Sequence, residues 1–198
     1  MSKRLAWIIV LLCGAGLMFT SCAGVQNKAT ADNFKSPVIK LVSFEVPQYD
    51  GYWYYAKAVA PTKGAGDDRG APLPMSFLFE IQNPNPFPVL LEGITYTVAF
   101  DNDFEVMTTN NNDSYWIPAG KTDQVRLNTM VTARSALVAL LLPNAPLLKN
   151  KGWDAWQTLE KWWKGVPNGA TPVTVKNASF TFIADGVTKV IPVEAKFP

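Results

Sequence analysis

Alternation of apolar and polar residues, with a period of two, dominates the chain from residue 37 onward and constrains its fold more than any other feature. Because successive side chains of a strand point to opposite faces, such alternation is typical of half-buried β-strands. The alternating segments are 42–46, 75–82, 94–100 and 125–131. A further, weaker strand is expected at 104–108.

The last two expected strands, 178–183 and 187–193, flank a turn made by Ala184, Asp185 and Gly186. Asp-Gly between two alternating runs is a strong hairpin signal, because glycine tolerates a positive φ. About seven short strands joined by turn residues predict an all-β, antiparallel β-sandwich.

Two short helices are expected to interrupt the strands before that hairpin, at 134–142 and 154–164, with a loop between them. Asp154 is a suitable N-cap for the second helix, with Gln157 at its third position and Gly165 just past its end.

The composition excludes several classes of enzyme. The 198 residues include no histidine and only two cysteines, so every mechanism that needs an imidazole base or a histidine-ligated metal is excluded. No phosphate-binding loop or nucleophile elbow occurs. With 18 basic and 16 acidic residues, no strong positive field favours nucleic acid. We expect no enzymatic activity, no cofactor, no bound metal and no nucleic-acid partner; an enzyme would need two carboxylates converging in a cleft.

The N-terminus has the features of a secretory signal peptide. Lys3 and Arg4 precede an uncharged apolar run at 5–19, which is short for a membrane-spanning helix. Residues 18–22, Met-Phe-Thr-Ser-Cys, resemble the bacterial lipobox, in which leucine is more usual at the position of Phe19. The alternatives are an uncleaved anchor helix or an ordinary signal peptide.

The lipobox resemblance implies that 1–21 is removed and that the thiol and new amino group of Cys22 are acylated, so that acyl chains hold the protein in the membrane. Ala23 fits the outer-membrane default of enteric lipoproteins, with the periplasmic face favoured over the cell surface. Residues 22–36 are small and polar and are expected to form a flexible tether. Residues 37–198 are expected to form the folded domain.

A proline-rich motif, Asn-Pro-Asn-Pro-Phe-Pro-Val at 83–89, lies between two expected strands. Proline lacks an amide donor and fixes φ, so this segment cannot continue a central strand. Asparagine side chains can satisfy the backbone groups left free. The motif therefore predicts a rigid crossover and not a catalytic loop.

This motif, followed by an alternating strand, an Ile-Pro-Ala-Gly turn at 117–120 and a second alternating strand, resembles the late-embryogenesis-abundant group 2 family, also called the water-stress and hypersensitive-response (WHy) domain. The resemblance covers about 37–198. It departs from the family in the aromatic insert at 49–70 and in the tryptophan-rich helix. The motif residues with an expected structural role are Asn83, Pro84, Asn85, Pro86, Phe87, Ile117, Pro118 and Gly120.

The resemblance implies a sandwich of immunoglobulin or fibronectin-III type with a helix at one end. It also implies a non-enzymatic protein linked to desiccation or other stress, with protection of proteins or membranes as the usual proposal. The sequence thus predicts a lipid-anchored binding or protective module of the bacterial cell envelope. The alternative is an accessory subunit of an envelope or cell-surface assembly, with a protein partner that the sequence does not identify.

Two aromatic clusters are candidate contact surfaces, although either could instead pack against the sandwich. Trp162 and Trp163 diverge by about 100° around a helix, so one helical face cannot bury the whole second cluster. The first cluster is Tyr52, Trp53, Tyr54 and Tyr55, and the second is Trp153, Trp156, Trp162 and Trp163.

Acidic residues at 101–105 could attract calcium, which prefers oxygen ligands. Asp101, Asp103 and Glu105 would share one strand face, with more Asn and Asp nearby. The spacing is not that of an EF-hand, and such segments ordinarily form turns, so we expect no metal site.

Overall fold

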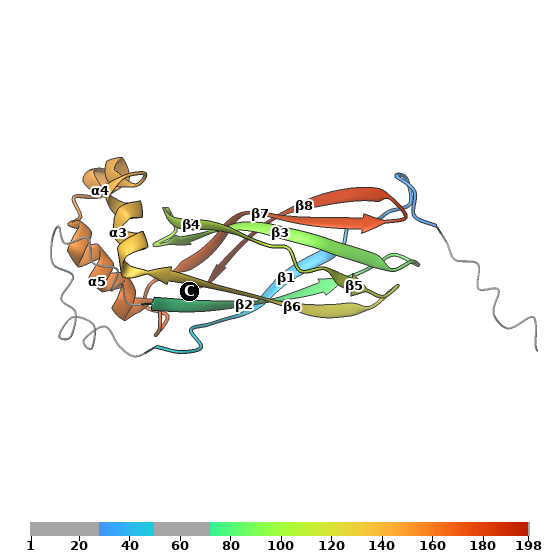
Figure 1. Cartoon of the computed structure of the whole chain (residues 1–198), viewed down its shortest axis with the longest axis horizontal. Coiled ribbons are helices and arrows are strands. Elements are labelled where there is room, and N and C mark those ends of the chain that lie inside the picture. The colour runs from blue at the N-terminus through green and yellow to red at the C-terminus, as the bar shows by residue number, and fades with distance from the viewer. Residues whose placement is uncertain (1–27, 50–71, 198) are drawn as a thin grey trace, which may run out of the picture.

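A computed structural model describes residues 28–49 and 72–197 of the chain. Within these residues, eight antiparallel strands form two sheets, and three short helices lie between β6 and β7 (Figure 1). The prediction of an all-β sandwich with helices before the last strand pair is therefore confirmed. The strands are β1 (Val38–Glu45), β2 (Pro72–Gln82), β3 (Val89–Phe100), β4 (Phe104–Asn111), β5 (Tyr115–Ile117), β6 (Thr122–Thr132), β7 (Val173–Ala184) and β8 (Val187–Phe197). The helices are α3 (Ala133–Leu141), α4 (Ala145–Lys151) and α5 (Ala155–Gly165).

The smaller sheet has the strand order β1-β2-β6. Pairing of β2 with β6 is continuous from Pro72 opposite Thr132 to Gln82 opposite Thr122. Apolar residues at alternate positions of β2, from Leu73 to Ile81, are buried, which is the face that the period of two assigns to the core.

The larger sheet has the order β4-β3-β7-β8, and β5 pairs with the start of β3. The β7–β8 hairpin turns at Asp185 and Gly186, whose φ angles are 46° and 82°. Two consecutive positive φ values match the right-handed twist of the flanking strands, so the predicted hairpin is confirmed.

Aromatic side chains from the facing sheets meet in the core. Phe77 of β2 contacts Tyr96 of β3 edge-to-face, with ring centroids 6.1 Å apart, and Phe79 contacts Phe180 of β7 at 5.3 Å. Such contacts add to the free energy gained from burial and fix how the sheets face each other.

The helices gather at one end of the sandwich (Figure 1). Thr132 caps α3 with a capping box shared with Ser135, and Asp154 caps α5 as expected. Helix α4 occupies the segment expected to be a loop. It begins after Asn144, has a proline in its first turn and ends at Gly152, whose φ of 65° closes the helix.

Candidate functional site

The two asparagines of the proline-rich motif form a buried hydrogen-bonded pair. Asn83 and Asn85 are 0% and 1% exposed, whereas the prolines between and after them face solvent. The Asn83 side-chain oxygen accepts from the Asn85 backbone N–H at 3.0 Å and from its Nδ2 at 2.9 Å. The crossover therefore holds its own shape through side chains, as the missing proline donors require.

The same pair joins the two motifs that the sequence singled out. Asn83 Nδ2 lies 2.9 Å from the carbonyl oxygen of Phe87 and 3.1 Å from those of Ile117 and Pro118. The backbone N–H of Gly120 donates to the carbonyl of Asn85 at 3.0 Å. Gly120 has a φ of 64°, which suits glycine. The order and spacing of the motifs thus reflect one structural unit.

Asn85 also holds the N-terminal segment. Its Oδ1 accepts from the Lys35 N–H at 2.7 Å, and its Nδ2 donates to the Lys35 carbonyl at 2.8 Å. Phe34 is 2% exposed and contacts Phe87 edge-to-face, while Lys189 Nζ donates to the Phe34 carbonyl. The expectation of a flexible tether over 22–36 is therefore wrong for residues 28–36, because this segment is packed and hydrogen-bonded.

The N-terminal segment lies at the end of the sandwich opposite the helices (Figure 1). The Ala29 N–H donates to Asp185 Oδ2 at 2.7 Å, which joins the segment to the β7–β8 turn. The expected lipid anchor Cys22 lies outside the described residues, six positions before Lys28. An extended chain spans at most 3.3–3.6 Å per residue, so Cys22 lies within about 20 Å of Lys28.

The first aromatic cluster, Tyr52 to Tyr55, lies outside the described residues.

The second aromatic cluster, the four tryptophans at 153, 156, 162 and 163, is mostly buried in the domain. Trp162 and Trp163 are both 0% exposed, and Trp153 and Trp156 are half-buried. For Trp162 and Trp163 the expected contact surface is therefore wrong, and packing over the open end of the sandwich is the correct alternative.

Both buried tryptophans of α5 find partners because more than one face of the helix is covered. Trp162 lies edge-to-face against Phe100 and Phe104, with centroids 5.2 and 5.5 Å apart. The backbone carbonyl of Trp163 accepts from the Tyr49 hydroxyl, which comes from the segment after β1.

Trp153 sits between the core and two cations. It stacks on Phe104 with an interplanar angle of 14°, and the Nζ atoms of Lys161 and Lys151 lie 4.5 and 5.3 Å from its ring centroid. These contacts explain how a partly exposed tryptophan is held without a partner protein.

The acidic residues at 101–105 pair with cations and polar groups of the protein. Asp101 and Asp103 lie in the β3–β4 turn and not on a strand face, which corrects that expectation. Asp101 accepts from Lys161 and from Trp162 Nε1 at 2.7 Å. Asp103 pairs with Lys151 at 3.5 Å. Across the described residues no three acidic or cysteine side chains gather as metal ligands would.

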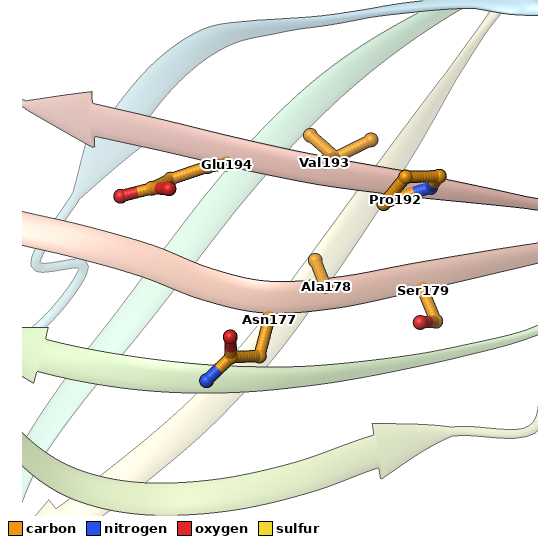
Figure 2. Close-up of a pocket in the computed structure, with 6 residues that line it drawn as sticks. All are labelled: Asn177, Ala178, Ser179, Pro192, Val193 and Glu194. Atoms are coloured by element: carbon orange, nitrogen blue, oxygen red, sulfur yellow. The ribbon is translucent and has the colours of Figure 1, made fainter.

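A surface depression of about 560 Å³ lies between β7 and β8, beside the irregular pairing near Asn177 (Figure 2). Its polar side chains are one carboxylate, Glu194, one amide, Asn177, and one hydroxyl, Ser179. A glycosidase that works through carboxylates needs a pair of Asp or Glu side chains. The residues that line this depression include a single carboxylate, so they do not supply such a pair.

Exposed apolar side chains of the described elements include Val38, Val42 and Met130 on the smaller sheet, and two further groups. One group lies on the solvent-exposed side of α3 and at its C-terminal end, where Val138, Leu141 and Leu142 are 49%, 51% and 69% exposed. The other includes Trp116 of β5, at 62%, and Val190 of β8, at 56%. Sequence reasoning missed Trp116, because β5 has only three residues and shows no periodicity.

One titratable group is linked to the stability of the core. Burial raises the pKa of the Tyr96 hydroxyl above its ordinary value of 10.0, and a hydrogen bond with Thr129 opposes this rise. The unfolded chain therefore loses this proton at lower pH than the folded one. The protonated hydroxyl of Tyr96 therefore contributes its full stabilisation of the folded state below pH 10.0. This contribution is lost as the pH rises through the pKa of the folded state.

We expect Tyr96→Phe to lose less stability between pH 7 and about pH 11 than the wild type, since phenylalanine has no proton to release. Urea unfolding at both values measures this difference. Asn112→Ala, at an exposed position without an ionisable side chain, is the control and should lose as much stability as the wild type. An equal loss in wild type and Tyr96→Phe would contradict the assignment.

Comparisons with known proteins give structural likenesses only. No family model and no curated protein matches the chain. A structure from Archaeoglobus fulgidus matches at 14% identity and a TM-score of 0.39, covering 82% of this chain and 94% of that one. A Bordetella pertussis protein provisionally described as ApaA matches at 8% identity and 0.43, covering 82% and 92%. A protein provisionally described as late embryogenesis abundant matches at 12% identity and 0.36, covering 99% and 86%.

Among the described residues, no helix combines the length and the apolar character needed to cross a bilayer.

Proposed function

We propose that this protein is a lipid-anchored, non-catalytic binding or protective module of the bacterial cell envelope. Acyl chains on Cys22 hold it in the outer membrane at the periplasmic face. The link to desiccation or other stress, and membership of the late-embryogenesis-abundant group 2 family, rest on the resemblance of the Asn83–Val89 and Ile117–Gly120 motifs.

The observation that carries this proposal is the fixed course of residues 29–35. Hydrogen bonds with Asn85, Asp185 and Lys189 hold this segment at the end of the sandwich opposite the helices. A chain pinned in this way transmits the position of an N-terminal anchor to the whole domain. The domain then lies close to the bilayer, with its helices directed away from the anchored end.

Replacing Cys22 with serine tests the anchor. We expect mass spectrometry to find acyl chains on Cys22 of the wild type and none on the variant, because the hydroxyl does not receive the diacylglyceryl group. Acyl chains contribute about 0.8 kcal/mol per buried CH₂, so variant protein from which residues 1–21 have been removed should also move from the detergent phase to the aqueous phase. Cys13→Ser, within the expected signal peptide, is the matched control and should carry the same acyl chains as the wild type. A wild-type protein without acyl chains on Cys22 would contradict lipidation, whereas membrane retention of Cys22→Ser alone would not, because an uncleaved apolar run at 5–19 can hold it there.

The alternative function, an accessory subunit of an envelope assembly, is favoured by the exposed apolar group at α3. Val138, Leu141 and Leu142 lie at the end that points away from the anchored segment. Purification of the lipidated protein in mild detergent tests this function. A stoichiometric partner that is retained by wild type and lost with Leu142→Lys supports it. A monodisperse single chain supports the free module.

A further inference from the structure

The second exposed apolar group forms a row across the larger sheet at the anchored end. Trp116 pairs with Leu90, which pairs with Ile183. Directly paired residues of neighbouring strands share a face. Trp116 is 62% exposed and Leu90 and Ile183 are partly exposed, whereas their sequence neighbours are buried, apart from the partly buried Tyr115. The three side chains therefore lie together on the outer face.

Val190 extends this row onto β8. It pairs with Thr181, which lies two positions before Ile183 on the same face of β7, and it is 56% exposed. The row defined by Trp116, Leu90, Ile183 and Val190 thus reaches from β5 to the edge strand. It is flanked by threonines and by the exposed carboxylate of Glu92.

The N-terminal segment joins the domain beside this row. Asp185, which accepts from the Ala29 N–H, follows Ile183 by two residues. Neighbouring strands are about 4.8 Å apart, so Trp116 lies only two strand spacings, about 10 Å, from Ile183. The row and the start of the chain that leads to Cys22 therefore occupy the same end of the sheet.

We propose that this row rests on the lipid surface to which Cys22 is anchored. The inference rests on the proposed lipidation. Lys28 follows Cys22 by six positions, which allows a separation of at most about 20 Å, so an anchored Cys22 keeps the row within reach of the headgroup region. Indole rings favour that region because they are apolar and carry one hydrogen-bond donor.

The charges at this end indicate that the lipid surface is recognised without a net electrostatic attraction. Lys28 and Lys35 of the N-terminal segment, and Lys189 beside it, are accompanied by Asp32, by Asp185 of the neighbouring turn and by Glu92 beside the row. Apolar contact with a surface of no net charge therefore fits better than binding to acidic lipid. The contact is weak alone and becomes effective because the anchor raises the local concentration of the surface.

Single cysteines carrying an environment-sensitive fluorophore test the contact in the full-length lipidated protein. Acylated Cys22 does not react with a thiol probe, so Trp116→Cys or Val190→Cys supplies the reactive site. The protein is reconstituted in vesicles of phosphatidylcholine and phosphatidylethanolamine. We expect a blue shift of the probe emission, relative to the Cys22→Ser background in solution, at both positions. Leu142→Cys on the helical end and Met130→Cys on the smaller sheet are controls of similar exposure, 69% and 54%, and should show no shift.

A second measurement uses Val190→Cys combined with Trp116→Ser. Loss of the interfacial indole should lower the docked fraction about tenfold and remove most of the blue shift, while the acyl chains keep the protein on the vesicles. Vesicle-bound protein whose probes at 116 and 190 stay as exposed as at 142 would overturn the inference while leaving lipidation intact. A shift that requires acidic lipid would also overturn it. Failure of the protein to bind vesicles would instead contradict the proposed anchor.

Discussion

Asn83→Ala should lower the free energy of unfolding by about 3–4 kcal/mol, the largest loss expected from a single polar side chain in this domain. The two N–H groups of the Asn83 amide lie within hydrogen-bonding distance of three backbone carbonyls, and its oxygen accepts from Asn85, at a position with no solvent exposure. Alanine removes these partners together and leaves buried polar groups without them. Each such group costs about 1–3 kcal/mol.

Urea unfolding of residues 23–198, followed by circular dichroism, measures this loss. Asn112→Ala is the matched control, because Asn112 is exposed and its side-chain oxygen accepts from neighbouring Asn110, so it should stay within about 0.5 kcal/mol of wild type. Asn83→Asp keeps the size and an acceptor but loses the donor, and should be at least as unstable as Asn83→Ala. A loss below about 1 kcal/mol in Asn83→Ala would show that the crossover does not depend on this side chain.

The strands were predictable because their cause is local. In β2 and β6, the side chains that pack into the core recur at every second position, so the sequence alone carries the pattern. Strand β5 was missed because three residues are too few to show a period. Helix α4 was missed because only Leu148 of its side chains is buried, although Asn144, Pro146 and Gly152 marked its two ends.

Contacts between distant polar groups could not be predicted in the same way. Lys35 and Asn85 are 50 residues apart, and their reciprocal hydrogen bonds leave no trace in hydrophobic periodicity. Residues 28–36 therefore show no periodicity in the sequence, although hydrogen bonds hold them in the fold. The motif resemblance identified Asn85 as structural but did not indicate that it holds the segment leading to the anchor.

The tryptophans of α5 show the limit of reasoning from one helix alone. A difference of about 100° between Trp162 and Trp163 suggests that one of them faces solvent when only one side of a helix is covered. In the fold, Phe100 of β3 and Phe104 of β4 cover Trp162, and Trp163 is also 0% exposed, so more than one side of α5 is covered. Burial therefore follows from the arrangement of elements and not from the helical wheel.

Trp162→Ala should destabilise the domain by about 3–5 kcal/mol, because a fully buried indole is lost and the open end of the sandwich is left with a cavity. Trp162 contacts the rings of Phe100 and Phe104, and its Nε1 donates to Asp101.

Trp162→Phe separates packing from hydrogen bonding at this position. It keeps an aromatic ring, and Asp101 keeps its bond to Lys161, so we expect a smaller loss of about 1–2 kcal/mol. Trp116→Ala is the control, since this side chain is 62% exposed and should change stability by less than about 0.5 kcal/mol. Circular dichroism is the readout, because these variants alter tryptophan fluorescence directly. Equal stability of Trp162→Ala and Trp116→Ala would contradict the conclusion that α5 closes the core, since a helix that only touched the sandwich would tolerate both changes alike.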